Sequence, residues 1–240
     1  MMYPLDGERI LTAWERGNER PEPWRALSLL ETALPERDAG ALAALPLAER
    51  NALLLRLRAL TFGRRMEGFA VCPECGAQLE FALATDDVES ALQAAEEESW
   101  LEQGTEMRMR PVNSRDLAAA MNEVSEAQAR ALLLARTVTP KATEEFEERT
   151  GLEERSDWLD RFERINASAE IRCVLPCAAC GGRPVLDLDI ARFLWREVAV
   201  AARRLLAEIH RLARAYGWSE QAIVAMSATR RAGYLEMLDA

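Results

Sequence analysis

Two short peptides of the same form, CPECG at residues 72–76 and CAACG at residues 177–181, constrain the fold of this chain more than any other feature. Each is a C-x-x-C pair followed by glycine, the sequence of a zinc knuckle, in which a tight turn points backbone amides at the thiolates. Strand-like sequences flank both pairs, so each knuckle is predicted at the tip of a β-hairpin. Together they supply the four ligands of a tetrahedral zinc site: Cys72, Cys75, Cys177 and Cys180.

The two knuckles are far apart, with about 100 residues between them, whereas a compact zinc ribbon has roughly 15–20 between its cysteine pairs. We interpret the sequence as one ribbon split by a large insertion. A redox dithiol is the competing interpretation, but it requires a C-x-x-C pair at a helix N-terminus in a βαβ unit, and neither pair has this context. Disulfides are disfavoured because all five cysteines fall in two short segments and no signal peptide indicates an oxidising compartment.

A site of four thiolates has no open position for water or substrate, so the expected zinc ion is structural rather than catalytic. The fifth cysteine, Cys173, is expected to be a half-buried strand residue, with a substitute zinc ligand as the alternative. Four thiolates around Zn²⁺ leave a net negative charge. Four arginines near the knuckles either offset this charge or are ordinary surface residues: Arg64, Arg65, Arg172 and Arg183.

Charge and hydropathy disfavour several classes of partner. The net charge of −10 and the pI of about 4.9 argue against the broad phosphate-binding surface that nucleic-acid recognition needs. No apolar run approaches the ~20 residues of a membrane span. The first residues lack a basic region followed by an apolar stretch, so export is not expected. The expected location is a cytoplasm of bacterial type, where reduced thiols can hold zinc.

Helical periodicity dominates the rest of the chain. Helices are predicted over residues 6–17, 24–34, 46–63, 190–216 and 229–240, with shorter ones beginning near Thr85, Ser114, Ser125 and Ser219. The third of these has Gly63 as its stop and an apolar face of Leu47, Leu54, Leu57 and Leu60. The longest buries a stripe at three- and four-residue steps: Leu194, Val198, Ala201, Leu205, Ile209, Leu212 and Tyr216. Residues 106–112 alternate and are expected to form a strand that joins the ribbon's sheet.

The predicted fold class is therefore mainly α with a small β zinc ribbon (α+β). Its regions are an N-terminal helical region 1–63, a split zinc ribbon 64–85 and 168–190, a largely helical insertion 86–167, and a C-terminal helical region 191–240. Within the insertion, residues 141–168 have many Glu and Arg residues at i,i+4 spacing, such as Glu145 and Arg149, which indicates a solvated helical face.

Signals of catalysis are absent from the sequence. It contains no phosphate-binding glycine loop, nucleophile elbow or H-E-x-x-H motif, and its single histidine, His210, lies on the long predicted helix. A lone histidine there is far more often a surface or packing residue than a general base. No enzyme activity and no small-molecule substrate are expected.

The order of several segments carries a resemblance to a known family. These segments are ILTAWERGNERPEPWRALSLLETALP, LPLAERNALLLRLRALTFG, EGFAVCPECGAQLEFAL, RMRPVNSRDL, CAACG and the terminal YGWSEQAIVAMSATRRAGYLEML. In this order the chain resembles the baseplate hub assembly chaperones of the T-even-phage type, in the form found in contractile injection systems and other phage-tail-like clusters. The resemblance covers most of the chain and is weakest over residues 138–168.

The resemblance implies a non-enzymatic factor that binds baseplate hub or spike-complex proteins during assembly and need not remain in the finished particle. It supplies no catalytic residues. An amphipathic helix or the segment 218–240 would cover apolar surface on a subunit until the next subunit displaces it. The candidate partner-binding residues, expected to be exposed at the chain end, are Trp218, Tyr234, Leu235 and Leu238.

Two other functions remain open from the residues. The ending of the chain loosely resembles a helix-turn-helix, so the main alternative is a zinc-ribbon transcriptional regulator in which Arg230 and Arg231 contact DNA. Its acidic pI and the small number of basic residues disfavour it. An enzyme built around the ribbon is the third possibility.

Overall fold

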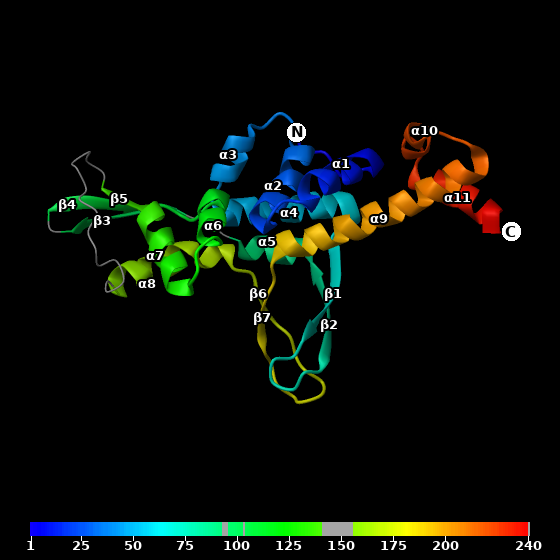
Figure 1. The fold of residues 1–240 in the computed structure, drawn as a ribbon. Coiled ribbons are helices and arrows are strands. Elements are labelled where there is room, and N and C mark those ends of the chain that lie inside the picture. Colours follow the sequence, from blue (N-terminus) through cyan, green and yellow to red (C-terminus); the bar gives the residue numbers. More distant parts are fainter. Residues whose placement is uncertain (93–95, 103, 141–155, 240) are drawn as a thin grey trace.

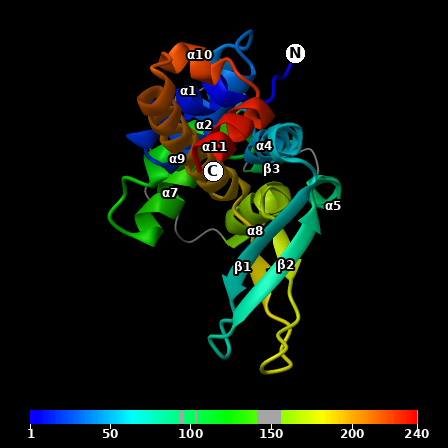
Figure 2. The ribbon, with the colours of Figure 1, turned by 90° about the vertical axis from the view of Figure 1, so that its right-hand side faces the viewer.

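The computed structural model describes residues 1–92, 96–102, 104–140 and 156–239. The molecule is elongated, with helices in the middle, a small sheet with helices at one end, and the C-terminal helices at the other (Figure 1). Two β-hairpins project together from the middle, and Figure 2 shows them side by side below the helices. Among the described residues, no helix combines the length and apolar composition that crossing a bilayer requires.

The central group contains the N-terminal helices and the first half of a long helix near the C-terminus. These are α1 (Gly7–Asn18), α2 (Glu22–Ala33), α3 (Ala39–Ala44), α4 (Leu47–Phe62) and α9 (Ile190–Tyr216). The side chains of Asp6 and Asp38 cap α1 and α3, and Gly63 ends α4 with a φ of 89°. The three N-terminal helices predicted from periodicity are confirmed, while the short α3 was not predicted.

Leucine side chains fill the central core. Those with no exposed surface are Leu27, Leu29, Leu30, Leu42, Leu54, Leu55, Leu57 and Leu194. Close approach is needed where α1 meets α9, since a Cβ on Gly17 would lie 2.5 Å from the Trp195 ring. Leu60, which was placed on the apolar face of α4, is 54% exposed. Successive three-residue steps rotate side chains away from the buried stripe of α4.

The long helix α9 has the predicted bounds, with Asp189 as its N-cap and Gly217 as a left-handed C-cap at φ 68°. Its second half packs against α10 (Glu220–Val224) and α11 (Ala228–Asp239) around a second core of Leu11, Ala202, Leu205, Ile209, Leu212 and Ile223. The buried stripe follows the prediction except at two positions. Ala202 is buried in place of Ala201, and Tyr216 is 36% exposed at the helix end.

Each predicted knuckle lies at the tip of an antiparallel hairpin, as expected. The first hairpin pairs β1 (Arg65–Val71) with β2 (Gln78–Ala84), and the second pairs β6 (Arg172–Val174) with β7 (Val185–Asp187). The hairpins are separate two-stranded sheets. The chain returns from the second hairpin directly into α9, which ties the ribbon to the central core.

The insertion between the hairpins contains a three-stranded sheet as well as helices. It contains α5 (Thr85–Ala91), α6 (Ser114–Ala120), α7 (Glu126–Thr137), α8 (Ser156–Asn166) and a 3-10 turn (Ala167–Ala169). It also contains a sheet in the order β3 (Glu98–Glu102), β4 (Thr105–Met109) and β5 (Val138–Pro140). The strand predicted at 106–112 corresponds to β4, but it pairs with β3 and β5 rather than with the ribbon.

A third core holds the insertion together. Its buried members are Met107, Met109, Leu134, Val138, Trp158 and Ile165. Helix α8 buries Trp158 and Ile165 in this core, and its opposite face has the expected exposed charged residues: Asp157, Asp160, Glu163 and Arg164. The example pair Glu145 and Arg149 lies outside the described residues.

Two predicted helix starts differ from the structure, while Ser125 and Ser219 cap α7 and α10 as predicted. The chain passes directly from β2 into α5, so Ala84 is the N-cap and Thr85 is a buried first-turn residue. Asn113, rather than Ser114, caps α6, because its side-chain oxygen accepts the amides of Arg115 and Asp116.

The same capping box places Asp116 in a buried ion-pair network. Its carboxylate is fully buried and accepts from Arg110 at 2.6 Å and from Arg136 at 2.8 Å. Burial opposes ionisation, but the hydrogen bonds from Arg110, Asn113 and Arg136 outweigh it, so the pKa of Asp116 lies below its ordinary value. The network links α6 to the last turn of α7.

We expect Asp116→Asn to lower the free energy of unfolding by about 2–3 kcal/mol at pH 7, since both arginines lose an ionised partner. Because the pKa of Asp116 is depressed on folding, this stabilisation is complete above its unfolded value of about 4 and is lost as the pH falls through the folded value. Urea unfolding of both proteins at pH 7 and below pH 4 measures this. A difference that does not shrink in acid would contradict the ionic explanation.

Candidate metal centre

The two hairpin tips bring together four cysteines from sequence positions more than 100 residues apart. Their sulfur atoms all lie within 4.8 Å of one another. Cys72 and Cys177 are buried, whereas Cys75 and Cys180 are exposed at the outer side of the cluster. The arrangement confirms that the predicted ligands Cys72, Cys75, Cys177 and Cys180 form one group rather than two separate dithiols.

The spacing of the sulfur atoms fits a tetrahedral metal site. The Cys72 and Cys180 sulfurs are 3.9 Å apart, and those of Cys75 and Cys177 are 3.6 Å apart. In a tetrahedron with Zn–S bonds of ~2.3 Å, neighbouring sulfurs lie roughly 3.8 Å apart. A disulfide would require ~2.05 Å. The four side chains could therefore hold one metal ion, with no position left for another ligand.

Backbone geometry at the tips favours thiolates. In each knuckle the glycine has a positive φ of 74°, at Gly76 and at Gly181, and its amide donates to the carbonyl of the first cysteine. The amides of Cys180 and Ala179 point at the Cys177 sulfur and lower its pKa to about 7. Four adjacent thiols cannot all ionise without a cation, because each new negative charge repels the others.

The remaining cysteine lies outside the sulfur cluster, and most of the nearby arginines have carboxylate partners. Cys173 is half-buried on β6, packs against the central core, and has its pKa raised by burial. The expectation of a strand residue is confirmed. Three of the four arginines are paired with carboxylates instead of with the site: Arg64 with Asp86, Arg65 with Glu67, and Arg172 with Glu170.

A buried arginine that sequence reasoning missed joins the ribbon to the helices. Arg58 of α4 has a side chain only 4% exposed and makes a two-pronged contact with Glu197 of α9, at 2.8 Å and 3.1 Å. Its third nitrogen donates to the carbonyls of Gly63 and Arg65 at the base of β1. The signal in the sequence was an arginine inside an otherwise apolar run, which indicates an internal partner.

Comparison with protein families identifies the chain. The family described as T4 bacteriophage base plate protein matches residues 24–164, which is more than half of the chain. The protein belongs to this family. The match runs from α2 to α8 and includes the first knuckle. No curated protein and no solved structure matches the chain.

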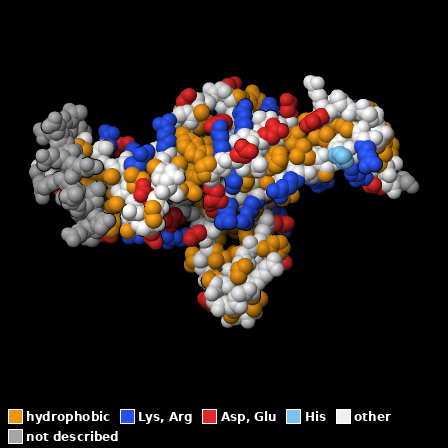
Figure 3. Space-filling model, in the orientation of Figure 1, with side chains coloured by type: hydrophobic (Ala, Val, Ile, Leu, Met, Phe, Trp, Pro, Cys, Tyr) orange, Lys and Arg blue, Asp and Glu red, His pale blue; other side chains and the backbone are white. Residues whose placement is uncertain are grey.

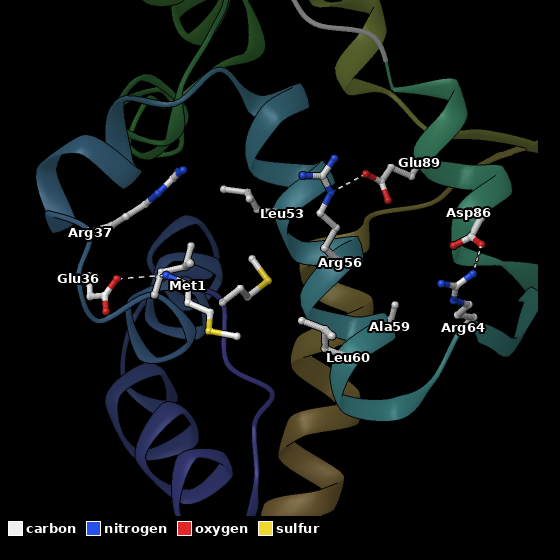
Figure 4. Close-up of a pocket in the computed structure, with 12 residues that line it drawn as sticks. Met1, Glu36, Arg37, Leu53, Arg56, Ala59, Leu60, Arg64, Asp86 and Glu89 are labelled. Carbon is white, nitrogen blue, oxygen red and sulfur yellow. Dashed lines mark hydrogen bonds and ion pairs between the residues drawn. The ribbon is translucent and has the colours of Figure 1, made fainter.

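The baseplate protein has a further concavity of about 700 Å³ between α4, α5 and the first residues (Figure 4). Its charged side chains pair along the rim: Arg56 donates to Glu89 at 2.6 Å and Arg64 to Asp86 at 2.7 Å. The twelve residues that line it include no histidine, cysteine, serine or lysine. The three carboxylates in its described walls, Glu36, Asp86 and Glu89, are all ion-paired.

The predicted partner-binding residues lie on α11 and the turn before α10, but most are not fully exposed. Trp218, Tyr234 and Leu235 are half-buried against the second core, and only Leu238 is exposed, at 38%. The Trp218 ring stacks on Tyr216 and meets Tyr234 edge-on at 4.8 Å. Met237, which was not singled out, is more exposed than any of them, at 69%.

Proposed function

We propose that this baseplate-family protein is a non-enzymatic assembly chaperone, which binds hub or spike-complex proteins while the baseplate of a contractile, phage-tail-like system is built. The observation that carries the proposal is the family match over residues 24–164. The four-cysteine group supports it, since a closed site can fix a fold but cannot bind substrate. The single histidine, His210, is exposed on α9.

The proposed ion in the cysteine group is Zn²⁺ with a structural role. Four thiolates at tetrahedral spacing favour zinc or iron, and zinc needs no redox partner. The ion would join two hairpins whose own pairing is short, only three residues per strand in the second. Independent two-stranded hairpins are marginal in water, so the metal would supply the stability that the strands lack.

Exposed apolar side chains support a protein-binding role. Several are on the hairpins, at Phe69, Val71, Val174 and Val185, each more than half exposed. Apolar surface of this kind on a soluble protein commonly marks an interaction site. The proposed partners are subunits that expose complementary surface before they are assembled.

No observation favours the alternative of a DNA-binding regulator. In a terminal helix-turn-helix, Arg230 and Arg231 would face DNA. Arg231 is instead buried, where it donates to Glu208 at 2.9 Å and to the Met226 carbonyl at 2.6 Å. Arg230 lies over the Tyr234 ring, 5.9 Å from its centre.

Co-expression with the hub and spike-complex subunits of a contractile, phage-tail-like system tests the chaperone proposal. We expect the protein to co-purify with one of them and to be absent from mature particles examined by mass spectrometry. Replacing Leu238 and Met237 by Ser should weaken capture by about 30-fold per anchor residue, at ~2 kcal/mol each.

Leu238 and Met237 define the terminal face on α11. Val124→Ser is the matched control, since Val124 is 94% exposed and lies outside this terminal face. Unchanged capture by a folded double variant would reject the terminal face. A stoichiometric presence in mature particles would instead indicate a structural baseplate component and contradict the chaperone role.

A further inference from the structure

A groove of about 810 Å³ lies between the two hairpins and the first half of α9. It belongs neither to the metal group at the hairpin tips nor to the terminal face on α11. Figure 3 shows the hollow below α9, with apolar side chains over the hairpins and basic side chains recurring along the helix. Its volume is in the range of sites that bury most of the surface of a drug-sized ligand.

The groove runs along strand edges. Residues 67–70 of β1 all line it, as do residues 186–189 at the end of β7 and the turn into α9. Successive side chains on a strand point to opposite faces, so an unbroken series of lining residues means that the groove follows the strand's edge. Each hairpin has only two strands in the described structure, so one edge of β1 has no strand partner. Unpaired edges accept an added strand.

The walls of the groove are apolar and partly open to solvent. Phe69 of β1 and Val200 of α9 are each 65% exposed at its mouth, and Phe81 and Phe193 contact each other inside it, with ring centres 6.4 Å apart. Gly68 lies beside these rings, where a Cβ would come within 2.7 Å of Phe81. The wall therefore offers apolar surface on both faces of β1, at Phe69 on one face and at Phe81 on the other.

The charges of the groove favour an acidic occupant. α9 carries six arginines and two glutamates in a chain of net charge −10. Three of the arginines line the groove: Arg192, Arg196 and Arg204. Arg196 is exposed and has no ion pair among the described residues.

The carboxylates that line the groove already have partners. Glu197 is held by Arg58, Glu67 by Arg65, and Asp189 caps α9. Asp187 lies 4.0 Å from Arg172. The unpaired charge that faces the groove is therefore positive.

We propose that this groove binds an extended segment of a partner protein, which adds as a strand along the free edge of β1. The segment alternates apolar residues, on the face of β1 that carries Phe69, with acidic residues, on the opposite face toward α9 and Arg196. Residues 67–70, which line the groove, span about 13 Å, so the paired part of the added strand is about four residues long. The proposal deepens the chaperone function by naming the surface and the chemistry of the segment held there.

Selection from a library of random twelve-residue displayed peptides tests this inference on the full-length, metal-loaded protein. We expect enriched peptides to alternate apolar residues with Asp or Glu. In fluorescence anisotropy, Arg196→Glu should weaken their binding at least tenfold, and so should N-methylation of alternate peptide amides, which blocks strand pairing. The matched control is Arg214→Glu, the same charge change at an exposed arginine near the C-terminal end of α9 that does not line the groove, which should change binding less than twofold.

Three outcomes would overturn the inference: enrichment of basic peptides, equal binding by the Arg196 and Arg214 variants, or tighter binding of a dT12 oligonucleotide than of any selected peptide. Phe69→Ser is an independent variant that should also weaken peptide binding, since Phe69 is exposed and its replacement leaves the core intact. Capture of hub subunits by Arg196→Glu separates the two proposals. Undiminished capture by this variant rejects the groove and leaves the chaperone function standing.

Discussion

Protein purified from cells supplied with zinc is expected to contain one zinc ion per chain, and Cys177→Ser is expected to contain none. Cys177 is one of the two buried ligands, and its loss leaves three thiolates and an open position. Structural zinc contributes about 10–16 kcal/mol of apparent binding free energy at neutral pH in small zinc domains, coupled to folding of the site. Elemental analysis measures the content, and chelator titration measures the affinity.

The control for this prediction is Cys173→Ser, a cysteine in the same hairpin that lies outside the sulfur cluster. It should keep a full equivalent of zinc. The helical signal of Cys177→Ser should fall little, because most helices belong to cores that do not include the hairpin tips. Wild-type protein without any bound metal would reject the site, and stoichiometric iron would reject zinc as its ion.

The second large effect is expected at Arg58, whose replacement by Ala should lower the free energy of unfolding by about 3–5 kcal/mol. The change removes both contacts with Glu197 and leaves that carboxylate, only 26% exposed, without its partner. It also leaves the carbonyls of Gly63 and Arg65 without a donor at the base of β1. Urea unfolding followed by circular dichroism measures the loss.

Arg56→Ala is the matched comparison, two residues away on the same helix. Arg56 is 60% exposed and makes one surface ion pair with Glu89, so its loss should be worth at most about 1 kcal/mol. Equal effects at the two positions would show that burial and the second pair of contacts at Arg58 contribute nothing. Zinc content should be unchanged in both variants, since the ligands lie at the other end of the hairpins.

The features that the sequence predicts well are those with local signals. The bounds of α9 follow from an apolar stripe at three- and four-residue steps that ends at Gly217, and the ligand set follows from two knuckles of the same form. The helix and each knuckle are recognised from one continuous segment of sequence, without reference to the rest of the fold. The family resemblance likewise came from the order of short segments and is confirmed at the level of the baseplate family.

The features that were missed depend on contacts between distant segments. The pairing of β4 with β5 is set by Val138–Pro140, a strand of three residues with no pattern of its own. The Arg58–Glu197 pair joins positions 139 residues apart. The groove depends on the distance between the two hairpins and α9, and this distance is set by tertiary packing that no sequence period reveals.

The split of the metal group sets the order in which the chain can mature during synthesis. The Cys75 and Cys177 sulfurs meet across 102 residues, which at ~5–20 residues per second takes a ribosome roughly 5–20 s to add. The central core waits as long, because Ile190, Leu194 and Val198 belong to it. The same late stretch of chain thus completes both the coordination of the ion and the central core. A translation product that ends before Cys177 would have neither.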